Sequence, residues 1–311
     1  SAAELQAFAA EVNAGNSFEG ENIFLGRDID MSGQEFTAIG TLNSPFKGVF
    51  DGDGHTVSNL ELINIDSDHQ GLFGVVNDGT VKNVDLENVN ISGRSWIGGI
   101  AGYTNGVIEN CIVSGSVRGS FAVGGIAGDL YGRVAECINR ANISGSTQIV
   151  GGIAGYMGTN AGIKTQIVKS INEGPVTGVL YTGGVAGNMT AGEITACSNQ
   201  ALVTATGYDG FTGGIAGSLG GGTISRCFNA GQIDGSSNYT ISGGIVGYLS
   251  SGTVENNYNL ADIAGNLAAG GIVGGIDGNS PVVYCYSTGN VTSELRVGGA
   301  VGWNRAGAVT D

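Results

Sequence analysis

A glycine-rich hexapeptide recurs nine times along this chain of 311 residues, and the repetition constrains the fold more than any other feature. The best copies are IGGIAG at 97–102, VGGIAG at 123–128 and 150–155, and TGGIAG at 212–217. Looser copies stand at 70–74, 182–187, 242–247, 270–274 and 297–302. A second element alternates with it, of the form V/I-x-x-C-x-N, as in Val134 to Asn139. Its cysteine slot recurs about every 28 residues. The slot holds Leu60, Val84, Cys111, Cys137, Ser170, Cys197, Cys227, Asn257 and Cys285.

This period predicts a β-solenoid with one coil per repeat. Fixed periods of roughly 20–50 residues are typical of solenoids and propellers, but a propeller blade needs about 40 residues. A leucine-rich repeat would show a leucine pattern and a helical half, which this sequence lacks. Instead, β-branched and small polar residues alternate, as at 106–111 and 252–257, and this pattern favours strands. We expect three short strands and three turns per coil, with coils about 4.8 Å apart.

The repeated hexapeptide is interpreted as a corner of the coil. Glycine adopts positive φ without steric cost and allows backbones to approach closely. The central isoleucine of each GGIAG string, such as Ile126, is expected to face the core. The corner would therefore recur because the coil recurs.

The cysteine slot is predicted to point inward, since Leu60 and Val84 share it. Free cysteine is among the most buried residue types, so we expect a ladder of buried thiols. Five cysteines cannot all pair within one chain. A disulfide between Cys111 and Cys137, or between Cys197 and Cys227, is the alternative. Two residues further along, stacked amides are expected to form a structural ladder. Its members are Asn139, Asn172, Asn199, Asn229 and Asn259.

The sequence divides into an N-terminal cap, 1–45, and a repeat region, 46–311. Ser1 and Glu4 form a candidate capping box for a short helix with one apolar face. This helix would cover the first coil, because exposed solenoid ends need capping. Lead-in strands are expected at 22–25 and 36–39. No capping element is evident after the last corner, so we expect the natural protein to continue beyond residue 311.

The corner string GLFG at 71–74, the eight later corners and the segment PFKGVFDGDGHTVSNL at 45–60 resemble the GLUG-repeat family. The resemblance covers roughly residues 45–302. It implies a right-handed parallel β-helix, here of about nine coils, in a secreted or surface-attached bacterial protein. Some members resemble adhesins, and others belong to immunoglobulin A-specific metallopeptidases, where the repeats lie outside the catalytic domain. This chain has no HExxH motif, so zinc-protease activity is not expected in it.

Composition narrows the possible partners. The net charge of −15 would repel nucleic acid, and no basic patch stands out. No apolar run approaches the roughly 18 residues that span a bilayer, so no membrane insertion is expected. The predicted setting is extracellular, at a bacterial cell surface.

An acidic stretch at 51–69 carries both histidines, His55 and His69. Asp51 and Asp53 are candidate ligands of a structural calcium, the one cofactor considered, although no further ligands complete a calcium loop. Alternatively, Asp53 is a turn residue, because it aligns with Asp78 in the repeat. A third possibility is an acid–base site in a polysaccharide-degrading β-helix enzyme, a lyase or glycoside hydrolase.

Aromatic residues flank the corners on both sides and are the candidate ligand-binding residues. Stacked coils would align them in rows along one edge, where rings and hydroxyl partners suit sugars. Packing around the corner is the alternative role. The candidates are Trp96, Phe121, Tyr181, Tyr208, Phe211, Tyr239, Tyr103 and Tyr156. We therefore expect a non-enzymatic adhesin or stalk that binds a glycan or a host surface protein, with no catalytic residue; the polysaccharide-degrading enzyme is the alternative.

Overall fold

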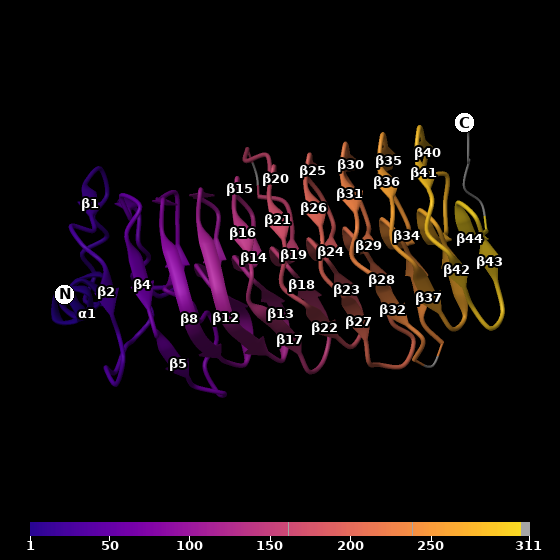
Figure 1. The fold of residues 1–311 in the computed structure, drawn as a ribbon. Helices are drawn as coiled ribbons and strands as arrows, with labels where there is room; N and C mark the ends of the chain where they lie inside the picture. Colours follow the sequence, from indigo (N-terminus) through magenta and orange to yellow (C-terminus); the bar gives the residue numbers. More distant parts are fainter. Residues whose placement is uncertain (161, 238, 306–311) are drawn as a thin grey trace.

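The computed structural model describes residues 1–305 except 161 and 238, and it is a parallel β-helix. Figure 1 shows the coils stacked along one axis, from the N-terminal helix at one end to the last strands at the other. Equivalent residues of successive coils pair in parallel register, as Ile108 does with Val134. The predicted right-handed parallel β-helix with a short N-terminal helix is confirmed, in about ten turns.

The described chain forms four parallel sheets. Sheet A contains β1 (Asn22–Phe24), β3 (Val49–Asp51), β7 (Thr80–Lys82), β11 (Val107–Glu109), β15 (Arg133–Ala135), β20 (Gln166–Val168), β25 (Glu193–Thr195), β30 (Thr223–Ser225), β35 (Thr253–Glu255) and β40 (Val282–Val283). Sheet D contains β9 (Ser95–Gly98), β13 (Phe121–Gly124), β18 (Ile149–Gly151), β23 (Tyr181–Gly183), β28 (Phe211–Gly213), β33 (Ile241–Gly243), β38 (Ala268–Gly270) and β43 (Val297–Gly298).

Sheet C follows sheet D around each glycine corner. It contains β6 (Phe73–Val76), β10 (Ala101–Thr104), β14 (Ala127–Leu130), β19 (Ala154–Met157), β24 (Ala186–Met189), β29 (Ala216–Leu219), β34 (Val246–Leu249), β39 (Val273–Ile276) and β44 (Val301–Asn304).

Sheet B is bent and carries two strand ladders. It contains β2 (Ile29–Asp30), β4 (Thr56–Ser58), β5 (Glu61–Ile63), β8 (Asp85–Ser92), β12 (Ile112–Gly119), β16 (Ile138–Asn139), β17 (Asn142–Gly145), β21 (Ile171–Asn172), β22 (Val176–Gly178), β26 (Ser198–Asn199), β27 (Val203–Ala205), β31 (Phe228–Asn229), β32 (Ile233–Gly235), β36 (Tyr258–Asn259), β37 (Ile263–Gly265), β41 (Tyr286–Ser287) and β42 (Val291–Thr292).

The coil is more finely divided than the sequence predicted. The coil at 133–157 holds five strands, β15 to β19, where three were expected. One break falls between sheets A and B, because the residue before each cysteine slot has positive φ, as Glu136 does at 55°. Another follows the asparagine ladder, where Asn139 turns the chain before β17.

Inward-facing residues of successive coils form one continuous apolar core. It includes the corner residue Ile126 and the thiols of Cys111, Cys137, Cys197 and Cys227, none of which is exposed to solvent. All five cysteines are free. The predicted thiol ladder is therefore confirmed for four positions, whereas Cys285, near the last coil, is only partly buried.

The asparagine ladder is confirmed as a structural element. The side-chain amide of Asn172 donates to Asn199 Oδ1 at 2.7 Å, and Asn199 donates in turn to Asn229 at 2.8 Å. Each also donates to a backbone carbonyl two residues ahead, such as Gly174 O at 2.9 Å. These buried amides satisfy both one another and the turn that follows them.

The corner glycines are needed for close approach, and the prediction of positive φ there is wrong. In the described corners, neither glycine of the GG pair lies in the left-handed region. A Cβ on Gly124 would collide with Ala127 O, and one on Gly125 with Gly152 O of the next coil. A Cβ on Gly125 would also lie 2.5 Å from the side-chain amide of Asn139, so the corner and the asparagine ladder are packed against each other. Left-handed glycines occur instead in the turns before sheet A, as at Gly222.

Helix α1 (Ala2–Asn13) covers the first coil as predicted. Ser1 and Glu4 form the capping box, and Leu5, Ala9 and Val12 are buried. Residues 22–24 form a strand, but the strand predicted at 36–39 is absent from the described structure apart from one bridge, Ile39 to Phe73. β1 and β2 already pair with β3 and β4, so sheets A and B begin within residues 1–45.

Candidate functional site: the aromatic edge

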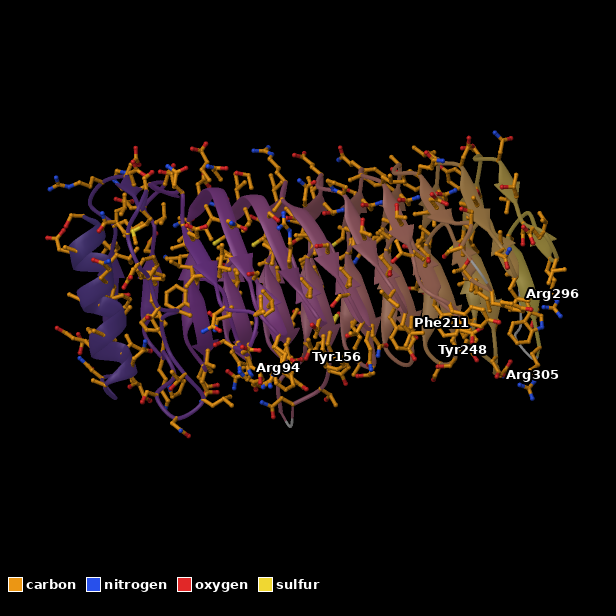
Figure 2. All side chains as sticks on the ribbon, turned by 90° about the horizontal axis from the view of Figure 1, so that it is seen from below. Arg94, Tyr156, Phe211, Tyr248, Arg296 and Arg305 are labelled. Carbon is orange, nitrogen blue, oxygen red and sulfur yellow. The ribbon has the colours of Figure 1, made fainter. Side chains whose placement is uncertain are left out.

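Six of the eight predicted ligand-binding residues lie where sheets D and C meet at the corners. We call this surface the aromatic edge. Its members are Trp96, Phe121, Tyr103, Tyr156, Tyr181 and Phe211, joined by Tyr131 and Tyr248. Figure 2 shows Tyr156, Phe211 and Tyr248 along one long edge of the molecule, together with the labelled arginines. All eight rings are half-buried, so each presents part of its surface to solvent.

The first cluster of the aromatic edge is built around Trp96. Its ring stacks on His69, with centroids 4.8 Å apart and planes at 17°, and meets the edge of Phe121 at 6.1 Å. Burial lowers the pKa of His69, which favours the neutral ring. Beside it, Arg94 donates to both carboxylate oxygens of Asp68, at 2.8 and 2.6 Å. This hydrogen bonding holds the pKa of Asp68 below its usual range.

A second cluster lies further along the same edge. Tyr181 and Phe211 occupy the same register position on β23 and β28, with centroids 5.7 Å apart. Phe211 stacks on Tyr248 of the next coil at 4.5 Å and 15°. The two remaining candidates, Tyr208 and Tyr239, form a separate pair 4.9 Å apart in the loops before sheet D. The exposed fractions of Tyr208 and Tyr239 are 60% and 48%. Because this pair lies outside the aromatic edge, the eight candidates form separate groups and not one row.

The third cluster consists of three tyrosines around a carboxylate. Tyr103, Asp129 and Tyr156 are register partners on the neighbouring strands β10, β14 and β19. Tyr131, two residues after Asp129, places its ring between the other two, 5.5 Å from Tyr103 and 6.1 Å from Tyr156. Burial raises the pKa of Asp129 to about 7. Sequence reasoning missed Asp129 and Tyr131, although Asp129 directly follows its corner, in the slot of Tyr103 and Tyr156.

The calcium candidates Asp51 and Asp53 do not face each other as two free carboxylates. Asp51 Oδ1 accepts hydrogen bonds from Asp53 N at 2.9 Å and Asn83 Nδ2 at 2.8 Å, and Lys82 Nζ lies 3.3 Å from Oδ2. Burial opposes ionisation of Asp51, but these partners outweigh it and lower its pKa. Asp53 has φ of 51°, as the turn interpretation requires. The calcium site stays a prediction.

The acidic stretch at 51–69 is divided among separate contacts. His55 Nδ1 lies 3.1 Å from Asp28 Oδ1, whereas His69 stacks on Trp96 and Asp68 pairs with Arg94. Within 1–305, apart from 161 and 238, no three histidine, cysteine or acidic side chains gather as a metal site. The histidines therefore belong to two different contacts and do not form one acid–base pair.

Two surface features went unnoticed in the sequence. Phe228, Tyr258 and Tyr286 stack in a column on sheet B, with centroids 5.2 and 5.3 Å apart and nearly parallel planes. They occupy the position after the cysteine slot, and this recurrence could have revealed them. A polar groove of about 710 Å³ also lies on sheet B. Its lining includes Asn59, Asn88, Asn90, Arg118 and Asn142.

Parts of the chain are similar in sequence to known proteins. Residues 12–115 match the N-terminal region of the M26 IgA1-specific metallo-endopeptidases. Halomucin of Haloquadratum walsbyi is 36% identical over 123 residues, which is 35% of this chain and 1% of halomucin. The chain therefore spans a very small part of that relative.

The fold has a counterpart among solved structures. The crystal structure of a candidate immunoglobulin A1 protease from Bacteroides ovatus superposes with a TM-score of 0.57 at 22% identity. The superposition covers 94% of this chain and 79% of the other, so the likeness concerns the whole β-helix. No helix in the described part of the chain has the length and apolar character to cross a membrane.

Proposed function

We propose that this chain is a module of a secreted or cell-surface protein, and that its aromatic edge binds a glycan. Support for the surface setting comes from the similarity to halomucin and to the N-terminal region of the M26 peptidases. The GLUG-repeat resemblance agrees with this setting. A bacterial cell surface is the location that we infer.

One observation carries the glycan proposal. Half-buried rings from several coils gather on one edge of the β-helix, in clusters such as Trp96 with Phe121 and Phe211 with Tyr248. Aromatic faces stack on sugar rings, and neighbouring polar groups bond their hydroxyls. A core role would require such rings to be fully buried, as Phe46 and Phe73 are at the N-terminal end.

A glycan array with the wild-type chain, with and without calcium, is the primary test. We expect retention on defined glycans, and we expect a variant with alanine at Trp96, Tyr181 and Phe211 to lose it. The matched control is Tyr286→Ala, which removes an exposed ring from sheet B and should leave retention unchanged. Equal retention by the triple variant would contradict a role for the aromatic edge.

Three other outcomes would favour a different function. A blank array combined with binding to a surface protein, lost in the same triple variant, would assign the aromatic edge to protein recognition. A blank array without any partner would favour a stalk, in which the β-helix only spaces other modules. Turnover of a polysaccharide, lost in Asp51→Ala, would favour the polysaccharide-degrading enzyme.

A further inference from the structure

Asp129 is a buried carboxylate without a partner. It is 8% exposed, and its Oδ1 accepts no hydrogen bond within the described structure. Other acidic groups of the chain are held by cations, as Asp68 is by Arg94 and Glu193 by Lys164. Leaving a carboxylate buried and unpaired costs several kcal/mol or forces it to take up a proton. Such a costly group within a defined cluster marks a candidate binding site.

The walls around Asp129 are aromatic. Tyr103 and Tyr156 flank it on the two neighbouring strands, and Tyr131 lies between their rings. The three planes are inclined to one another, by 36° at the first contact and 52° at the second. The three rings thus follow one another along the edge beside Asp129. Ring faces attract cations. When it is ionised, the carboxylate of Asp129 adds a negative charge beside these rings.

The hydroxyl groups of Tyr131 and Tyr156 differ in whether they are held by a hydrogen bond. The hydroxyl of Tyr156 is tied to Thr190 Oγ1 at 2.9 Å, on the neighbouring coil. The hydroxyl of Tyr131, in contrast, makes no hydrogen bond to any described residue. Tyr131 also follows directly after β14, outside the strand. A rotation of this half-buried ring would give solvent access to Asp129.

Among the described residues, no lysine or arginine pairs with Asp129. The strand β9 packs against β14, but the arginine before it, Arg94, is bound to Asp68. The other titratable groups acting here are the three tyrosines and Asp78. Burial raises the pKa of Tyr103, and the charges of Asp129 and then Asp78 raise it further. All of these groups are neutral or negative near neutral pH. The local field therefore favours a positively charged guest.

We propose that Asp129, Tyr103, Tyr131 and Tyr156 form a binding site for a methylated ammonium group. A primary ammonium would bring three N–H donors, of which one carboxylate satisfies only part. A methylated ammonium needs no hydrogen bond, and its methyl groups fit against the three rings. The inference is independent of glycan binding, because it is the charge that defines this ligand.

The test uses choline as the probe and 3,3-dimethyl-1-butanol, its neutral isostere, as the reference. Both are titrated into the whole chain by calorimetry at pH 8 and pH 5. We expect choline to bind at pH 8 at least about tenfold more tightly than at pH 5, because Asp129 is ionised only at the higher pH. The neutral isostere should bind at neither pH. This comparison needs no variant and so does not depend on a variant folding.

Two variants complete the test. Asp129→Asn should weaken choline binding at least about tenfold at pH 8 and remove its pH dependence. Glu294→Gln makes the same change in net charge at an exposed position and should leave binding unchanged. Equal binding of choline and its neutral isostere, equal weakening by both variants, or no choline binding at pH 8 would each overturn the proposal. A blank glycan array would not affect it.

Discussion

The unpaired carboxylate of Asp129 makes the stability of the β-helix depend on pH in a defined direction. Burial raises its pKa to about 7, from 3.8 for a free aspartate. Between these values the unfolded chain releases the proton while the folded chain keeps it. The unfolded state therefore binds fewer protons in this window, and the free energy of unfolding falls as the pH rises through it.

The magnitude follows from the size of the shift. One pKa unit corresponds to about 1.4 kcal/mol, so a shift of about three units costs about 4 kcal/mol once the pH exceeds 7. Most of this cost accumulates between pH 5 and pH 8, where it amounts to about 3 kcal/mol. Asp129→Asn keeps the shape of the side chain but cannot ionise. The variant should therefore gain about 3 kcal/mol relative to the wild type over this pH interval.

Urea unfolding of both proteins at pH 5 and pH 8, followed by far-UV circular dichroism, measures this gain. Other titrating groups cancel, because they are the same in both proteins. Glu294→Gln serves as the control and should show no such gain, since its carboxylate is exposed. If the free-energy difference between wild type and Asp129→Asn is the same at both pH values, the carboxylate is not desolvated as the structure indicates. The reasoning would then be refuted.

Three further predictions concern the framework. Asn199→Ala removes hydrogen bonds to Asn172, Ala201 O and Asn229, and should cost about 3 kcal/mol in urea unfolding; an effect no larger than that of the exposed Gln200→Ala would contradict the ladder. Gly184→Ala should abolish soluble folded protein, because its Cβ would collide with Gly214 O and Asn199, whereas Gly220→Ala should be tolerated in the same circular dichroism assay. Millimolar calcium should raise the melting temperature of the wild type but not of Asp53→Asn, and equal shifts would contradict the predicted calcium site.

The sequence predicts the core of this molecule well because the core repeats. Each coil places a residue at the same depth, so a slot shared by Leu60, Val84 and Cys111 reveals that it faces inward. The asparagine ladder follows from the same logic, since side chains in register meet at the spacing of the coils. Repetition thus substitutes for knowledge of the tertiary contacts.

The backbone conformation is harder to predict from the sequence repeat than the core is. Glycine allows both a positive φ and a close approach of two backbones. The presence of a glycine therefore does not show which of the two a corner requires. The structure shows close approach at Gly124 and Gly125, whereas non-glycine residues such as Glu136 and Lys169 adopt the left-handed conformation. These residues make the break between sheets A and B. Asparagine, which favours this conformation, occupies the position in only some coils, as Asn83 and Asn110 do, so the residue type is an incomplete signal.

For a related reason, only part of the candidate site could be predicted from the sequence. Tyr103 and Tyr156 stand out as aromatic residues after a corner, but Asp129 in the same slot does not match them. This slot holds different residue types in successive coils, so a search for a repeated residue does not find the site. Only the register of β10, β14 and β19 brings the carboxylate between the rings.

The two faces of sheet C differ in how strongly the fold restricts the residue types that they carry. One residue after this slot, the buried positions of successive coils hold Leu130, Met157, Met189, Leu219 and Leu249. The slot itself holds in turn a ring, a carboxylate, a second ring, an amide and a hydroxyl, in Tyr103, Asp129, Tyr156, Asn188 and Ser218. The β-helix requires apolar residues on the first face, but nothing in its geometry requires a tyrosine or a buried aspartate on the second. An unpaired carboxylate that weakens the fold near neutral pH is best explained by what it binds.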